Sequence, residues 1–128
     1  MKLVLIEDNA DLALTMRVLL EIRGYDVKCY LRGHEFLREA AALEPQDVLI
    51  TDYYLPDVNG IELVKRARAA CAGVKAILLT GSREEAIVRA AREIRDCRVE
   101  YKPLDYEALE RGINAIRARK GSDRPASA

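Results

Sequence analysis

The chain has 128 residues, which is enough for one domain with a hydrophobic core of its own. Its 21 basic and 21 acidic residues cancel, so bulk charge favours neither nucleic acid nor an anionic membrane as a direct partner. Without an apolar stretch of ~20 residues or a signal peptide after Met1, we expect a cytoplasmic protein that does not span a membrane.

Five short apolar runs alternate with segments of helical periodicity, which is typical of a βαβ series with a parallel sheet. Strands are predicted over residues 3–6, 26–30, 48–51, 76–79 and 98–101. Helices are predicted after the N-cap residue Asn9, over 34–43, over 61–71, after the N-cap residue Ser82, and over 106–119 after the N-cap residue Asp105. Right-handed crossovers then place helices on both faces of a five-stranded sheet, a doubly wound α/β fold.

Polar side chains follow four of the predicted strands. Glu7 and Asp8 come after the first, Asp52 after the third, Thr80 after the fourth and Lys102 after the fifth. In an open parallel sheet, ligands bind outside the carboxyl ends of the strands. We therefore expect these five side chains to converge in one pocket.

This set of side chains suits a divalent cation and a phosphoryl group. Mg²⁺ prefers oxygen ligands, and Glu7, Asp8 and Asp52 supply three carboxylates. Without a cation these carboxylates would repel one another. A carboxylate is also a competent nucleophile toward phosphorus, while an ammonium such as that of Lys102 and a hydroxyl such as that of Thr80 can bind phosphoryl oxygens.

The motifs at these strand ends resemble the receiver domain of two-component response regulators. They are Glu7-Asp8, then Asp52 followed by Leu55-Pro56-Asp57 and Gly60, then Thr80-Gly81, and finally Lys102-Pro103. The order and the spacing of all four match, over the chain from Lys2 to about Arg119. The resemblance implies a flavodoxin-like (βα)5 fold and a receiver domain over residues 1–120. Residues 121–128 are small or polar, so we expect them to form a disordered tail.

The resemblance also implies a role for each site residue. Asp52 would accept a phosphoryl group from a sensor histidine kinase or a histidine phosphotransfer protein. Mg²⁺, or Mn²⁺ in its place, would be held by Glu7, Asp8, Asp52 and the backbone carbonyl of Tyr54. Lys102 would contact the phosphoryl group, and Thr80 would move toward it on activation. The Lys102-Pro103 peptide bond would be cis, which proline makes tolerable in energy.

Partners and output are implied in the same way. A downstream protein, or an effector fused to the domain, would bind residues 83–119, and the chain would be a monomer or a weak homodimer. Such a domain is a regulatory phosphoacceptor rather than an enzyme, although it assists its own phosphorylation and autodephosphorylation.

Two positions bear on how the signal is passed on and how long it lasts. Three residues before Lys102 the family usually has an aromatic ring that turns inward on activation, whereas this chain has Val99. Two residues after Asp52 stands Tyr54, which we expect to overhang the path of attacking water and to slow autodephosphorylation. Because Val99 stands at the position of the usual ring, a phosphorylation-independent adaptor with a receiver fold is kept as the alternative function.

Two other classes of protein, one of them an enzyme class, fit the sequence less well. A metal-dependent phosphatase of the haloacid-dehalogenase type also has an Asp nucleophile after a parallel strand, but it needs a second Asp where this chain has Tyr54. A nucleotide-binding Rossmann domain needs a glycine-rich loop after the first strand, and here Glu7, Asp8 and Asn9 occupy that place.

Overall fold

The computed structural model describes residues 1–81 and 84–118, and within them the chain forms one five-stranded parallel sheet. The strands are β1 (Lys2–Ile6), β2 (Asp26–Tyr30), β3 (Val48–Asp52), β4 (Lys75–Thr80) and β5 (Cys97–Tyr101). Their spatial order is β2-β1-β3-β4-β5. The predicted flavodoxin-like, doubly wound fold is confirmed.

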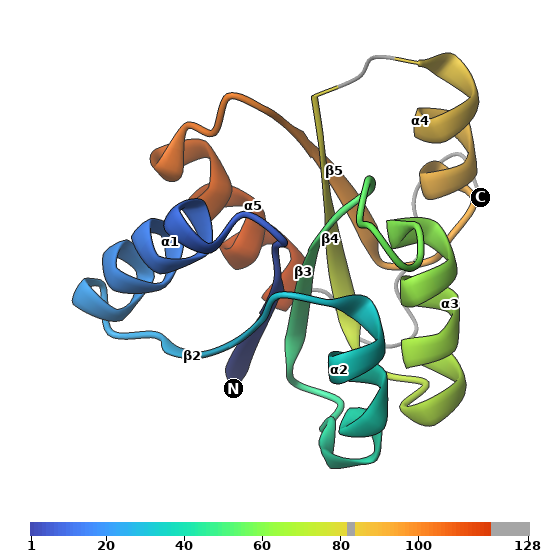
Figure 1. Ribbon diagram of the computed structural model, residues 1–128, viewed down its shortest axis with the longest axis horizontal. Coiled ribbons are helices and arrows are strands. Elements are labelled where there is room, and N and C mark those ends of the chain that lie inside the picture. Colours follow the sequence, from blue (N-terminus) through green and yellow to red (C-terminus); the bar gives the residue numbers. More distant parts are fainter. Residues whose placement is uncertain (82–83, 119–128) are drawn as a thin grey trace.

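Within the described residues, five α-helices cover the two faces of this sheet (Figure 1). They are α1 (Ala10–Ile22), α2 (Gly33–Arg38), α3 (Gly60–Ala70), α4 (Glu85–Arg92) and α5 (Tyr106–Arg117), with a short 3-10 helix, η1 (Ala40–Ala42), after α2. In Figure 1, α1 and α5 lie on one side of the sheet, whereas α2, α3 and α4 lie on the other. None of the helices in the described ranges is long and apolar enough to cross a membrane.

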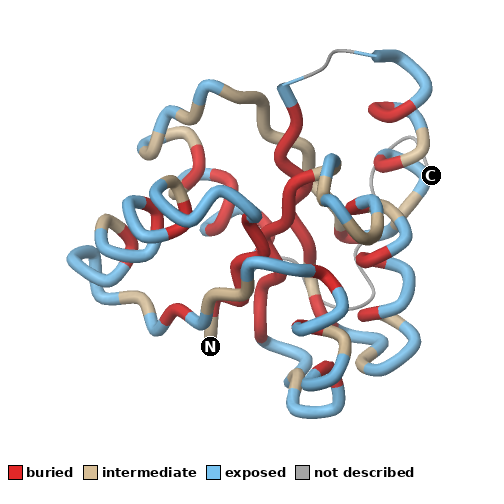
Figure 2. The backbone as a smooth tube through the Cα atoms, viewed as in Figure 1, coloured by how far each residue is buried: buried red, intermediate tan, exposed pale blue. Residues whose placement is uncertain are grey.

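The core follows from the alternation of side chains along the strands. Leu3 and Leu5 pack against helices α1 and α5, while their neighbours Val4 and Ile6 pack on the opposite face against α2 and α3. All residues of β3 are buried, because helices cover this strand on both faces (Figure 2). The centre of the sheet is therefore a rigid support for the groups at its edge.

The strand register places the predicted site residues at one edge of the sheet. Ile6 pairs with Thr51, Asp52 with Leu79, and Thr80 with Tyr101, so the carboxyl ends of β1, β3, β4 and β5 are level. The chain order reverses between β1 and β3, which is where open α/β sheets bind ligands.

Some predicted boundaries differ from the structure. The second helix ends at Arg38, and a separate 3-10 turn over Ala40–Ala42 follows it, three residues before Pro45. The N-cap residue of α4 is Glu84, whereas Ser82 lies outside the described residues. Helix α5 ends at Arg117, and Arg119 also lies outside the described residues. Asn9 and Asp105 accept hydrogen bonds from the first turns of their helices, as predicted.

Candidate functional site

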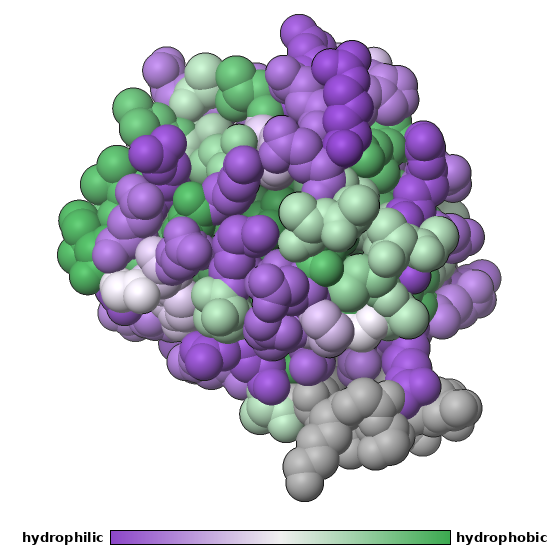
Figure 3. All heavy atoms as spheres, turned by 90° about the horizontal axis from the view of Figure 1, so that it is seen from below, coloured by the Kyte–Doolittle hydropathy of each residue, from purple (hydrophilic) through white to green (hydrophobic). Residues whose placement is uncertain are grey.

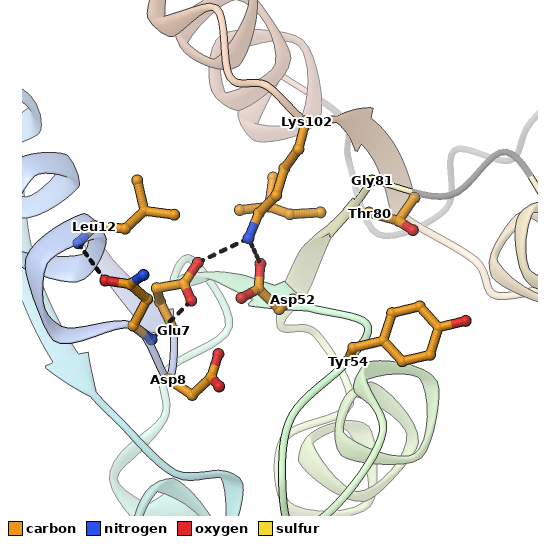
Figure 4. Close-up of a pocket in the computed structure, with 10 residues that line it drawn as sticks. Glu7, Asp8, Leu12, Asp52, Tyr54, Thr80, Gly81 and Lys102 are labelled. Atoms are coloured by element: carbon orange, nitrogen blue, oxygen red, sulfur yellow. Dashed lines mark hydrogen bonds and ion pairs between the residues drawn. The ribbon is translucent and has the colours of Figure 1, made fainter.

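The predicted side chains converge at the carboxyl edge of the sheet in a pocket of about 290 Å³ (Figure 4). The pocket is lined by Glu7, Asp8, Asn9, Leu12, Asp52, Tyr54, Leu79, Thr80, Gly81 and Lys102. All five side chains that the sequence analysis predicts to converge therefore line this pocket.

Lys102 joins the two buried carboxylates of this pocket. Its Nζ lies 2.8 Å from Asp52 Oδ1 and 3.0 Å from Glu7 Oε1. The Lys102 side chain is 28% exposed, whereas those of Glu7 and Asp52 are 1% and 6% exposed. Burial by itself lowers the pKa of Lys102, but the two carboxylates outweigh it and raise the pKa. The ammonium of Lys102 therefore keeps its positive charge between the two carboxylates.

Glu7 is held by groups of the chain itself. Oε2 accepts a hydrogen bond of 3.0 Å from the Asn9 amide, and Oε1 accepts one from Lys102. Burial would raise the pKa of Glu7, but the hydrogen bonds to Asp52, Asn9 and Lys102 lower it overall. Glu7 is thus the carboxylate of this pair that keeps its charge.

Asp52 has the opposite electrostatic balance. Burial first, and then the neighbouring Glu7, raise the pKa of Asp52 to about 7, although Lys102 opposes the shift. Asp52 Oδ1 is buried and receives no hydrogen bond of good geometry from the described residues, so Lys102 is its charged contact. A second cation beside Asp52 would compensate the rest of the negative charge on this carboxylate.

The acidic residues fit a hard cation. Glu7, Asp8 and Asp52 each offer a carboxylate oxygen, and these oxygens lie within 4.8 Å of one another. Asp8 is exposed, so its side chain faces the mouth of the pocket. Mg²⁺ and Mn²⁺ prefer oxygen donors, and the incompletely compensated charge of the buried Asp52 carboxylate favours a cation beside it. The Tyr54 carbonyl stays a predicted ligand.

Close packing explains why residue 60, in the motif that follows Asp52, is glycine. A Cβ atom on Gly60 would collide with the backbone carbonyl oxygen of Asp52 and would lie 2.9 Å from the Cα atom of Tyr53. The Gly60 amide also donates a 2.7 Å hydrogen bond to the Tyr53 carbonyl. Gly60 thus lets the first turn of α3 approach the backbone of the phosphoacceptor candidate.

The ends of β4 and β5 are tied together beside the pocket. Thr80 is buried, and its carbonyl accepts a 2.9 Å hydrogen bond from the Lys102 amide. The Lys102-Pro103 peptide bond is cis, as the resemblance implies. A Cβ atom on Gly81 would meet nothing within 4 Å, so this conformation itself does not require glycine there.

Tyr54 does not overhang Asp52 as we expected. Its ring points away from Asp52 in Figure 4, and Tyr54 is 59% exposed. The Tyr54 hydroxyl donates a 3.2 Å hydrogen bond to Glu84 Oε1, and the ring packs edge-on against Tyr53. These contacts hold the ring outward, so the steric reason for slow autodephosphorylation is absent from this conformation.

The sequence reasoning missed the role of Asp57, which belongs to the motif after β3. Its carboxylate accepts hydrogen bonds from the amides of Gly33 (3.2 Å) and His34 (2.8 Å) at the start of α2. The signal for this was the acid after Pro56, but its partner lies more than 20 residues away and only the fold brings the two together.

The comparisons with known proteins agree with this geometry. Residues 3–114 match the family model of the response regulator receiver domain. The chain belongs to this family. The response regulator receiver protein CpdR of Brucella abortus (strain 2308) is 32% identical over 118 residues, which cover 90% of this receiver and 95% of the relative.

Other relatives are longer proteins. The transcriptional regulatory protein CpxR homolog of Haemophilus influenzae is 30% identical over 121 residues, covering 94% of this receiver but only 52% of the relative. The receiver thus spans about half the length of such transcriptional regulators.

Solved structures confirm the fold. The chemotaxis protein CheY4 of Vibrio cholerae superposes with a TM-score of 0.81 at 21% identity, covering 90% of this receiver and 97% of that chain. As a receiver domain of two-component response regulators, the chain belongs to a regulatory family whose signalling rests on a phosphoacceptor.

Proposed function

We propose that this receiver is a phosphorylation-controlled switch in which Asp52 is the phosphoryl acceptor. The observation that carries the proposal is the position of Lys102 Nζ, 2.8 Å from Asp52 and 3.0 Å from Glu7, above three clustered carboxylates. The donor is a phosphohistidine on a sensor kinase or a phosphotransfer protein in the cytoplasm. A bound Mg²⁺ or Mn²⁺, held by Glu7, Asp8, Asp52 and the Tyr54 carbonyl, supplies positive charge to the phosphoryl oxygens.

The transfer needs one bond made and one broken. A carboxylate oxygen of Asp52 forms a bond to phosphorus while the phosphorus–nitrogen bond of the phosphohistidine breaks, and the bonding electron pair leaves with the imidazole nitrogen. Lys102 binds a negatively charged phosphoryl oxygen as the phosphoryl group is transferred to Asp52. The Thr80 hydroxyl, at the same edge of the pocket, donates to a second oxygen of the product.

A small phosphodonor tests this assignment. With acetyl phosphate and Mg²⁺ we expect one phosphoryl group per chain, no labelling of Asp52→Asn, and little labelling of Asp8→Asn or of protein in chelator. Asp11→Asn is the control, because Asp11 is an exposed acid in the first turn of α1 that does not line the pocket. Stoichiometric labelling of Asp52→Asn would overturn the assignment of Asp52, whereas failure of the unaltered chain to be labelled would favour the adaptor alternative.

An exposed apolar row on α1 supports a protein as the donor. Leu14, Val18 and Ile22 repeat every four residues and are 59%, 43% and 74% exposed. Hydrophobic side chains gather at the edge of the molecule where α1 lies (Figure 3). Helix α1 starts beside the pocket, which Asn9 and Leu12 line, so a partner covering this row would reach Asp52.

The row is tested by comparing two donors. We expect Val18→Glu to slow phosphotransfer from autophosphorylated histidine kinases by about tenfold, because a charge on a buried contact costs more than 1 kcal/mol. Labelling by acetyl phosphate should not change, since the pocket is intact. Equal rates of phosphotransfer to Val18→Glu and to the unaltered chain, with every kinase tested, would contradict a contact between the donor and α1.

A further inference from the structure

Two tyrosines follow Asp52 directly, and both contact the region of α4. The Tyr53 side chain packs against the apolar cluster of Leu78, Ile87 and Ala91, which joins β4 to α4. Tyr53 and Glu84 also line a groove of about 410 Å³ between α3 and α4. The segment that carries the phosphoacceptor candidate is therefore in physical contact with a helix that lies outside the pocket.

The Tyr54 hydroxyl makes this connection specific. It donates a hydrogen bond of 3.2 Å to Glu84 Oε1. Glu84 is the N-cap residue of α4, and its side chain makes no capping hydrogen bond to the helix. The Tyr54 ring is also set by an edge-on contact with Tyr53, with 4.7 Å between centroids and 78° between planes.

The other end of this connection is fixed to the sheet. The Tyr53 amide donates a 2.8 Å hydrogen bond to the Leu79 carbonyl, and the Tyr53 carbonyl accepts from Gly60. The backbone beside Tyr54 therefore moves with β3 and β4. A hydrogen bond from this support to Glu84 restrains the start of α4 relative to the sheet.

We propose that Tyr54 and Glu84 are positioning residues that hold the start of α4 in its resting place. This inference rests on the proposed function, because Thr80 is expected to move toward the phosphoryl group and Glu84 follows it by only four residues. A displacement of Glu84 together with Thr80 lengthens the Tyr54–Glu84 hydrogen bond. The hydrogen bond thus opposes the active conformation. This opposition does not depend on an aromatic ring at position 99, where this chain has Val99.

Binding of beryllofluoride, which stands in for the phosphoryl group, measures this opposition. We expect Tyr54→Phe to bind beryllofluoride with Mg²⁺ about two- to tenfold more tightly than the unaltered chain, because the lost hydrogen bond stabilised only the resting form. Glu84→Ala should also bind more tightly. The double variant should be no tighter than the tighter single variant, since both changes remove one interaction.

Exchange of backbone amides gives a second readout without any phosphoryl analogue. We expect the amides of α4 (residues 85–92) to exchange faster in Tyr54→Phe, while those of β3 stay protected. Tyr30→Phe is the matched control, because it removes a tyrosine–glutamate hydrogen bond of 2.6 Å to Glu39 that is remote from α4. It should alter neither readout.

The outcomes separate this inference from the proposed function. Unchanged beryllofluoride affinity and unchanged exchange in Tyr54→Phe would overturn the positioning role, as would fully additive effects of the two substitutions. If the unaltered chain fails to bind beryllofluoride at all, the proposed function is overturned instead. The exchange of α4 then decides by itself whether Tyr54 and Glu84 position the helix.

Discussion

At the scale of single residues, the pocket holds more negative charge than the described residues neutralise. Glu7 and Asp52 are almost fully buried and share the ammonium of Lys102, while Asp8 adds a third carboxylate at the mouth. Burying charge without full compensation costs stability, and functional sites commonly carry such a cost. The arrangement is poised for a cation and a phosphoryl group rather than for maximal stability.

Replacing the central carboxylate should therefore stabilise the protein. In metal-free buffer at pH 8 we expect Asp52→Asn to raise the free energy of unfolding by about 1 kcal/mol, because the amide carries no charge and can donate to Glu7. Urea titration measures this change.

The stabilisation should depend on pH. Burial raises the folded-state pKa of Asp52 from its ordinary value of 3.8 to about 7, so the stabilising protonation of Asp52 is lost as the pH rises toward 7. The advantage of asparagine should therefore shrink toward pH 4. Asp11→Asn should remain within about 0.5 kcal/mol of the unaltered chain at both pH values. A less stable Asp52→Asn would contradict this account.

At the scale of elements, the loop between β3 and α3 is pinned on two sides. Asp57 binds the amides at the start of α2, and Gly60 allows α3 to begin against the backbone of Asp52. These contacts fix the loop that follows the phosphoacceptor candidate. They also explain why the motif after β3 contains residues that do not touch the pocket.

Removal of the Asp57 contacts should loosen α2. We expect Asp57→Ala to lower the free energy of unfolding by about 1–2 kcal/mol, because the amides of Gly33 and His34 lose their acceptor. Asp57→Asn keeps one acceptor oxygen and should lose less. Denaturant titration of both variants checks the order, and equal stability of Asp57→Ala and the unaltered chain would refute it.

The two glycines near the site should respond differently to a methyl group. Gly60→Ala should cost about 1–3 kcal/mol, since the new Cβ would collide with the Asp52 carbonyl oxygen. Gly81→Ala should stay within about 0.5 kcal/mol, because its Cβ would enter open space. Thermal unfolding of the two variants in parallel provides the comparison, and a reversed order would show that the loop after β3 yields easily.

At the scale of the whole molecule, the sheet connects the pocket to the surface formed by α4, β5 and α5. Val99 lies in the apolar cluster beneath α4 with Leu78 and Ile87. Because valine is short and stiff, it can fill little of the space that a moving Thr80 would vacate. Coupling between the pocket and this surface should therefore be at the low end of the ~1–3 kcal/mol usual for linked sites.

Backbone amide shifts of the free and the beryllofluoride-bound protein test this coupling. We expect changes around the pocket and smaller changes over residues 84–115, with the largest of these at the start of α4. The edge strand β2 serves as an internal reference, because it lies farthest from β5 in the strand order. Silence over residues 84–115 would leave the phosphorylation-independent adaptor as the better interpretation.

The sequence by itself determined the fold class and the membership of the site. Alternating apolar runs and helical periods specify parallel strands, and a parallel sheet brings the carboxyl ends of its strands to one edge. Glu7, Asp8, Asp52, Thr80 and Lys102 could therefore be placed together before any distance was known. Local signals also gave the helix starts at Asn9 and Asp105, since capping depends on residues close in the chain.

Only the tertiary structure decided which contacts these groups make, how far they are buried and where their side chains point. The contact of Lys102 with Glu7 joins residues 95 apart in sequence, and the burial that raises the pKa of Asp52 comes from the packing of several elements. The outward turn of Tyr54 depends on Glu84, and the hydrogen bonds of Asp57 depend on α2. Side-chain orientation is set by partners distant in sequence, and a local pattern carries no information about them.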